Sequence, residues 1–332
     1  MKRRQRKRSK TPALRRVAKR AVKAQYRVRN WAAYNQSLVK RGSITLWISD
    51  EVLAAWQPPP SGPRPRGGQK QYSDGAMECL LMVKAVYHLT LRATEGFAQS
   101  LGHLLKIDVP VPDYTTVCRR AKTLAVALPT TATGPIHAVL DSTGLKIYGE
   151  GEWKVRQHGY SKRRTWRKLH VSVDEATGEI QAEELTEAST DDAEMVGPLL
   201  EQTPAEVEQL SADGAYDKEK VYTAAQTHGV STLTIPPRRD AHIWQHGNCA
   251  ATPHPRDVNL RRIREVGRHQ WKAESRYHRR SLAETTMFRF KTLFGDQLSA
   301  RELARQKTEA RIKCAALNRM TRLGMPESYR VA

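Results

Sequence analysis

The stretch His137-Ala138-Val139-Leu140-Asp141 is a short apolar run that ends in a carboxylate. Its length and composition are typical of a buried strand. Two further apolar runs follow at residues 168–173 and 180–185, and Glu175-Ala176-Thr177-Gly178 lies between them. Apolar runs separated by a short turn predict a hairpin. We therefore expect three consecutive strands, the first with Asp141 at its end.

The chain then alternates between helix and strand patterns. We expect a helix over residues 191–200, a strand over 207–212 that ends at Asp213, a helix over 218–227 and a strand over 232–235. Three strands, then helix, strand, helix and strand, is the element order of an RNase H-like α/β sheet. The sequence therefore predicts an α/β core of that class.

The residues before this core have helical periodicity. Residues 77–86 and 91–105 suit two helices, and Asp113 can cap a third that begins at Tyr114. The third helix would present Arg119, Arg120 and Lys122. Three helices that end in a short basic one resemble a helix-turn-helix DNA reader. The alternative is a small helical bundle that does not touch DNA.

The basic residues are concentrated near the start of the chain. The net charge is +22, and residues 1–49 hold sixteen Lys and Arg and no acid, which leaves +6 for the rest. Such an arm favours a polyanion partner, because Lys and Arg on phosphates release condensed counterions. A solvated tail is the alternative. We divide the chain into a basic tail (1–23), a basic region with a Pro/Gly-rich linker (24–72), a helical DNA-binding region (73–130) and a catalytic domain (131–332).

The spacing of the cysteines and the hydropathy of the chain predict where the protein is located in the cell. The four cysteines form no CxxC pair, and no apolar run approaches the eighteen residues of a membrane span. We expect a cytoplasmic protein without a disulfide framework, a membrane partner or a small-molecule cofactor. We place it in a bacterium, associated with the nucleoid when it is bound to DNA.

Asp141 and Asp213 lie beside small residues, in Leu140-Asp141-Ser142-Thr143-Gly144 and Ser211-Ala212-Asp213-Gly214-Ala215. Carboxylates that converge from separate elements can hold two divalent ions roughly 3.5–4 Å apart for phosphoryl transfer. Oxygen ligands favour Mg²⁺ or Mn²⁺ over zinc. On their own, however, two acids at strand ends are also typical of solvated turns.

A third polar group lies farther along the chain. Tyr277, Arg280, Glu284 and Lys291 have a spacing that places them within about 60° on one face of a single helix. The opposite face is apolar and comprises Leu282, Ala283, Met287, Phe290, Leu293 and Phe294. An ordinary amphipathic helix explains the polarity, but it does not explain this spacing of a Tyr, an Arg, a Glu and a Lys.

The spacing Tyr277-x2-Arg280-x3-Glu284-x6-Lys291 resembles the Y-(2)-R-(3)-E-(6)-K signature of transposases in the insertion sequence 4 and insertion sequence 5 families. Further stretches resemble the insertion sequence 5 family, in particular its subgroup around insertion sequence 903. These stretches are Trp31–Asn35, Lys40–Trp47, Tyr148–Lys154, Asp213–Asp217, Ile235–Arg238 and Leu323–Pro326.

The resemblance implies a DDE transposase with a core of the retroviral integrase type. Its DDE triad would be Asp141, Asp213 and Glu284, which would hold two Mg²⁺ or Mn²⁺ ions. Two features depart from the family: the basic residues 1–23 look like an extension, and Arg276 stands where many relatives have a small residue. Neither departure removes a triad position.

Two further segments contain basic residues or possible metal ligands. Residues 153–168 combine seven Lys and Arg with aromatics, so we expect DNA contacts from Trp153, Lys154, Arg163 and Arg164. A solvated hairpin is the alternative. Residues 242–254 hold three His, Cys249 and Trp244, a spacing that matches no standard zinc finger. Trp244 could instead stack on a flipped base at a transposon end.

Together these features predict an enzyme that binds double-stranded DNA at the ends of an insertion sequence. It would cleave there and join the freed 3′ hydroxyls to target DNA. Arg280, Lys291 and Tyr277 would contact DNA near the cut, and holding two ends together requires a homo-oligomer. The alternatives are another RNase H-like nuclease, such as a junction resolvase, and a non-catalytic DNA-binding descendant of a transposase.

Overall fold

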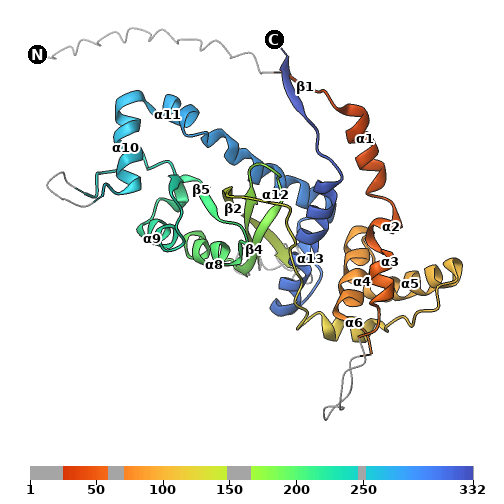
Figure 1. The fold of residues 1–332 in the computed structure, drawn as a ribbon. Helices are drawn as coiled ribbons and strands as arrows, with labels where there is room; N and C mark the ends of the chain where they lie inside the picture. Colours follow the sequence, from red (N-terminus) through yellow and green to blue (C-terminus); the bar gives the residue numbers. More distant parts are fainter. Residues whose placement is uncertain (1–24, 59–70, 148–165, 246–251, 332) are drawn as a thin grey trace, which may run out of the picture.

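The structure is a computed structural model that describes residues 25–58, 71–147, 166–245 and 252–331. Within these ranges the chain forms a central mixed sheet with helices on both faces (Figure 1). No helix in the described parts of the chain has the length and apolar character needed to span a membrane. The arrangement confirms a mixed α/β protein.

The sheet has the strand order β4-β3-β2-β5-β6, with β7 paired to the far end of β2. Its strands are β2 (Ile136–Ile147), β3 (Trp166–Asp174), β4 (Ile180–Glu187), β5 (Val207–Ser211), β6 (Thr232–Thr234) and β7 (Gln297–Leu298). The β2–β3 and β3–β4 pairs are antiparallel, whereas β5 pairs parallel with β2 and with β6. β2 is thus the central strand, with the antiparallel half of the sheet on one side and the parallel half on the other.

One structural detail corrects the sequence prediction. β2 continues six residues beyond Asp141, so this carboxylate lies within the strand and not at its end. The reason is the antiparallel partner β3, which stays hydrogen-bonded to β2 as far as Lys146, with Asp141 opposite Val171. Only the parallel partner β5 ends near Asp141.

Each face of the sheet has its own hydrophobic core, as alternation along a strand requires. On one face, Val139 and Leu145 of β2 pack in the cluster that includes Phe290. On the other face, Ala138 and Leu140 pack with residues of the two helices that link the parallel strands. These helices are α8 (Val196–Gln202), which follows the 3-10 turn η1 (Asp192–Met195), and α9 (Glu219–Thr227), which follows η2 (Gly214–Tyr216).

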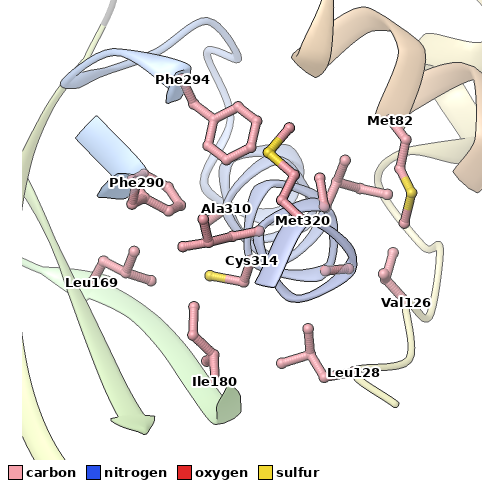
Figure 2. Packing of buried hydrophobic residues seen from close by; sticks show 14 of the residues in the cluster. Met82, Val126, Leu128, Leu169, Ile180, Phe290, Phe294, Ala310, Cys314 and Met320 are labelled. Carbon is pink, nitrogen blue, oxygen red and sulfur yellow. The ribbon is translucent and has the colours of Figure 1, made fainter. Parts of the chain in front are cut away.

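The first core is organised around α13 (Leu303–Arg322). Figure 2 shows Cys314 of this helix among side chains from the sheet, from residues 126–128 and from two other helices. The labelled neighbours include Leu169, Ile180, Val126, Leu128, Met82 and Phe290. The helical region and the sheet therefore share one buried cluster.

The helical region begins with α1 (Trp31–Lys40), α2 (Ile44–Trp47) and α3 (Asp50–Ala54), and continues with α4 (Asp74–Val86), α5 (Leu91–Leu105) and α6 (Tyr114–Arg120). The predicted cap of the third helix in residues 73–130 is confirmed, because Asp113 Oδ1 accepts hydrogen bonds from the amides of Thr115 and Thr116 at 2.9 and 3.0 Å. Figure 1 shows α4, α5 and α6 beside α13, on the side away from α10 (Pro255–Val266) and α11 (Arg268–Glu274).

A two-stranded ribbon joins the two ends of the described chain. β1 (Gln25–Val28) pairs antiparallel with β8 (Ser328–Val331). Next to the ribbon, Arg29 Nε donates to Glu327 at 2.6 Å and the Asn30 side chain donates to the carbonyl of Met325 at 2.9 Å. These contacts bring α1 to the C-terminal end of α13.

Candidate active site

Asp141 and Asp213 lie at corresponding positions on the two parallel strands. The last β2–β5 pair is Val139 with Ser211, and each aspartate comes two residues after its member of that pair. Residues paired across two strands lie on the same face of the sheet, and so do residues two apart along one strand. Both carboxylates are therefore directed to the same face as Val139. Both aspartates lie at the carboxyl end of the paired stretch of these strands, where ligands commonly bind in open α/β sheets.

Glu284 comes from α12 (Ser281–Phe294), which contacts β2 and β3, and its charge acts on Asp141. The buried face of α12 holds Ala283, Met287, Phe290 and Phe294, as the apolar pattern predicts. The Phe290 and Phe294 rings meet edge to face with centroids 5.6 Å apart. This packing anchors α12 on the same sheet face to which Asp141 is directed.

The predicted single helical stripe is wrong in one respect. Tyr277 and Arg280 belong to a separate 3-10 turn, η3 (Tyr277–Arg280), which precedes α12. The turn begins after Arg276, whose φ of 56° lies in the left-handed region. That conformation is strained for a residue other than glycine. Here Arg276 donates to buried Glu175 at 3.3 Å.

The three carboxylates share one electrostatic environment. Burial raises the pKa of Asp141, and the negative charges of Asp213 and Glu284 raise it further. The hydrogen bond from the Ser142 amide and the charge of Arg280 act in the opposite direction. Arg280 forms an ion pair with Glu284 one turn along the chain. The guanidinium is therefore a cation within reach of both Asp141 and Glu284.

A divalent ion suits this site by its donor chemistry. Within the described residues, no three His, Cys, Asp or Glu side chains stand close enough to form a ready metal cage. The three acids supply only oxygen donors, which Mg²⁺ and Mn²⁺ prefer. Burial is the main cause of the raised pKa of Asp141 and the charges of Asp213 and Glu284 add to it, and a bound cation would offset both effects.

Two residues that the sequence analysis left without a role also lie at this site. Tyr216 is only 2% exposed, and its hydroxyl has no hydrogen-bond partner among the described residues. Burial raises the pKa of Tyr216, and the charges of Asp192, Asp141 and Asp213 raise it further. Asp192 is held by Lys168 Nζ at 3.2 Å. The Asp213–Asp217 motif contained Tyr216, but nothing local in the sequence indicated that Asp192 would come near.

The predicted DNA contacts of the helical region have different environments. Arg119 is exposed at the end of α6. Arg120 is turned inward, where it pairs with Asp74 and donates to the Tyr72 carbonyl at 3.0 Å. Lys122 lies past the helix, 3.6 Å from Glu302. Of these three, Arg119 is the side chain on the surface without an acidic partner among the described residues.

Of the remaining residues predicted to contact DNA, two lie near Glu284 and four lie outside the described residues. Lys291 is half-buried in the last turn of α12, near Asp296, and its charge contributes to lowering the pKa of that acid. Burial raises the pKa of Tyr277, and Arg280, Asp213 and Glu284 all act on it, so Tyr277 lies at the candidate site. Trp153, Lys154, Arg163 and Arg164 lie outside the described residues.

The segment around Trp244 forms an aromatic cluster. Arg256 lies over the Trp244 ring at 4.0 Å, and His254 and Tyr222 meet that ring edge to face. Arg256 also donates to Asp217 at 2.8 Å. The described part of this segment shows no metal cluster, and Cys249 lies outside it. The cluster thus gives Asp217 of the Asp213–Asp217 motif a structural role.

Comparison with known proteins gives two family matches and one similar structure. Residues 132–319 match a family model described as Transposase DDE domain, and residues 39–150 match a second model with the same description. The structure is also similar to the piggyBac transposase in a synaptic complex with hairpin DNA. That similarity has 10% sequence identity and a TM-score of 0.41, and it covers 85% of this chain and 75% of the other.

Proposed function

Because the chain belongs to the DDE transposase family, we propose that it cleaves DNA at the ends of an insertion sequence and joins the freed 3′ hydroxyls to target DNA. The observation that supports this proposal most is that the charges of Asp213 and Glu284 both act on Asp141, although the three acids come from different elements. Three carboxylates from three separate elements are the ligand set that two-metal phosphoryl transfer requires.

Each step of the proposed reaction is an in-line displacement at phosphorus. Water attacks the phosphodiester at the transposon end and releases a 3′ hydroxyl, which then attacks a phosphodiester of the target. Bound Mg²⁺ or Mn²⁺ would supply activation of the nucleophile and stabilisation of the leaving oxygen. Asp141, Asp213 and Glu284 would hold the ions at this site.

The chain's own cations would position the DNA. Arg280, now paired with Glu284, would turn toward a phosphate once a cation neutralises that carboxylate. Lys291 would contact the backbone farther along α12. The Tyr216 hydroxyl, buried without a partner among the described residues, would donate to an oxygen that enters the site.

The strand order supports an RNase H-like core of the retroviral integrase type within residues 131–332. Three antiparallel strands followed by two parallel ones, with helices between, are the arrangement expected of that class. A helix-turn-helix role for residues 73–130 and membership of the insertion sequence 903 subgroup stay predictions. So do the homo-oligomer, the bacterial location and the DNA contacts of Arg119.

Cleavage assays on defined DNA test this function. The substrate is a duplex that carries the terminal inverted repeat found beside the gene, incubated with Mg²⁺ and a target plasmid. We expect a nick at the repeat boundary and strand-transfer products, while a scrambled repeat of the same composition gives neither. Equal cleavage of the scrambled duplex, or selective cleavage of a four-way junction, would instead favour the junction-resolving nuclease. Binding without cleavage would favour a non-catalytic DNA-binding protein.

A further inference from the structure

Two arginines from distant parts of the chain meet beside the C-terminal end of α13. Arg41 directly follows α1, whose Ser37 donates to the carbonyl of Gly324 at 3.2 Å. Arg289 lies on α12, five residues after Glu284, and donates to Thr321 Oγ1 at 3.1 Å. Thr321 and Gly324 belong to the last turn of α13 and the residues just after it. The N-terminal helix and the Glu284 helix are therefore joined at this point.

The two guanidiniums are close enough to repel each other. Burial, and to a smaller extent the charge of Arg41, lower the pKa of Arg289 to about 10. The Nε and Nη2 atoms of Arg41 are buried and have no hydrogen-bond partner among the residues that the structure describes. Within the described residues, no carboxylate pairs with either guanidinium, and no acidic side chain contributes to the shift at Arg289.

The surroundings compensate these charges only in part. The Tyr34 ring lies 6.0 Å from Arg41 Cζ, which is at the limit of a cation–π contact. The C-terminal end of α13 adds the partial negative charge of a helix terminus. Neither supplies acceptors for the two buried N–H groups of Arg41. A buried cation without acceptors is unfavourable, so the pair is complementary to an anion that would accept from both side chains.

We propose that Arg41 and Arg289 form a phosphate-binding site, and that a backbone phosphate of bound DNA occupies it. Guanidinium groups match a tetrahedral oxyanion with paired N–H donors. The DNA source of the phosphate rests on the proposed function. It follows from the position of Arg289, which lies on the Glu284 helix about 7.5 Å along its axis from that carboxylate. Occupancy would connect α1, and with it the basic start of the chain, to the catalytic helix.

The first experiment uses inorganic phosphate and no DNA. The full chain and its Arg41→Gln, Arg289→Gln and Arg262→Gln variants are melted in sodium phosphate and in sodium chloride at equal pH and ionic strength. Arg262 is the control because it is an arginine already paired with Glu274 and Glu265. We expect phosphate to raise the Tm of the wild type and of Arg262→Gln, but not of the other two.

The chloride melts separate a binding role from a structural one. Removing one of two repelling cations should leave the Tm in chloride unchanged or higher. If Arg41→Gln and Arg289→Gln both have a lower Tm in chloride, and phosphate still raises their Tm, the arginines only support packing. That result would contradict the proposal that they bind phosphate.

The second experiment measures binding of terminal-repeat duplex in Ca²⁺ as a function of salt. A variant that neutralises one phosphate fewer than the wild type should have a log–log salt slope that is shallower by about 0.9. Both single variants and the double variant should show the same change in slope, because the two arginines share one phosphate. An unchanged slope would overturn DNA as the occupant, even if free phosphate stabilises the wild type. Failure of the wild type to cut its repeat would overturn the proposed function alone, since the phosphate melts do not depend on it.

Discussion

Replacing Glu284 and Lys291 on the same helix should separate chemistry from DNA binding. The two residues lie seven apart, about 10.5 Å along α12, so they cannot both serve one phosphate. Glu284→Gln keeps the size of the side chain and removes the charge that would hold a cation. The side chain is 55% exposed, so the substitution should not perturb the fold. A loss of about 3 kcal/mol of transition-state stabilisation would lower the cleavage rate of this variant by about 150-fold.

Lys291→Ala should have the reverse effect. A charge-assisted contact with a phosphate contributes about 1.5–3 kcal/mol, which corresponds to about 10- to 150-fold weaker binding. Cleavage at saturating DNA should stay close to that of the wild type. The matched control is Lys307→Ala, because Lys307 is a half-exposed lysine on α13 that pairs with Glu184 on β4. Arg289 would have been the natural control from the sequence, but its burial and its contact with Thr321 rule it out.

The assay combines gel shifts in Ca²⁺ with cleavage in Mg²⁺ for all three variants. Normal cleavage by Glu284→Gln would refute the assignment of this carboxylate. Equal loss of binding in Lys291→Ala and Lys307→Ala would refute the placement of DNA along α12.

Three other perturbations test the anchoring of α12, the protonation of a buried carboxyl group on β4 and the basic tail. Phe290→Ala removes a ring that is 1% exposed and should lower the free energy of unfolding, measured by urea titration, by about 3–5 kcal/mol. The control Phe288→Ala changes a side chain that is 70% exposed on the same helix and should lower it by less than about 0.5 kcal/mol. Similar losses in the two variants would refute the packing of α12. Burial raises the pKa of Glu183 to about 7 from its ordinary 4.5, so the folded protein binds this proton more tightly and loses stability as the pH rises through that interval. Glu183→Gln should therefore gain Tm relative to the wild type between pH 4.5 and pH 8, and a constant difference would contradict the shift. Deleting residues 2–23 removes twelve of the 56 Lys and Arg. The log–log salt slope of DNA binding should then become shallower by about 0.9 for each phosphate that the tail neutralises. An unchanged slope would show that the tail does not contact DNA.

Local pattern was sufficient to predict the parts of the fold that depend on periodicity. The apolar runs located β3 to β6, and the apolar face of α12 is buried at Ala283, Met287, Phe290 and Phe294. The Asp113 cap was predictable because a cap depends only on neighbouring residues. The three carboxylates could be nominated together only because the spacing of Tyr277, Arg280, Glu284 and Lys291 resembles a transposase signature, since two acids beside small residues are by themselves also typical of solvated turns.

The features that were not predicted depend on contacts between distant residues. β2 extends past Asp141 because β3 stays paired with it, and that pairing has no signature within β2 itself. The sequence predicted that Arg120 lies on the surface of α6, but its guanidinium is turned inward and pairs with Asp74, forty-six residues earlier in the chain. The approach of Asp192 to Tyr216 likewise requires the η1 turn and the η2 turn to meet. The β1–β8 ribbon joins opposite ends of the described chain, which periodicity alone cannot show.

The central claim is that Asp141 and its two partner acids perform metal-dependent cleavage of the transposon end. The most direct measurement compares cleavage of end-labelled terminal-repeat DNA in Mg²⁺ by the wild type, Asp141→Asn and the control Asp296→Asn. Asp296 is also an aspartate next to β2, but it pairs with Lys146 at 2.7 Å and lies outside the proposed triad. We predict that Asp141→Asn binds the duplex as tightly as the wild type in Ca²⁺ and gives no cleavage, while Asp296→Asn cleaves normally. Cleavage by Asp141→Asn at a rate near that of the wild type would contradict the account.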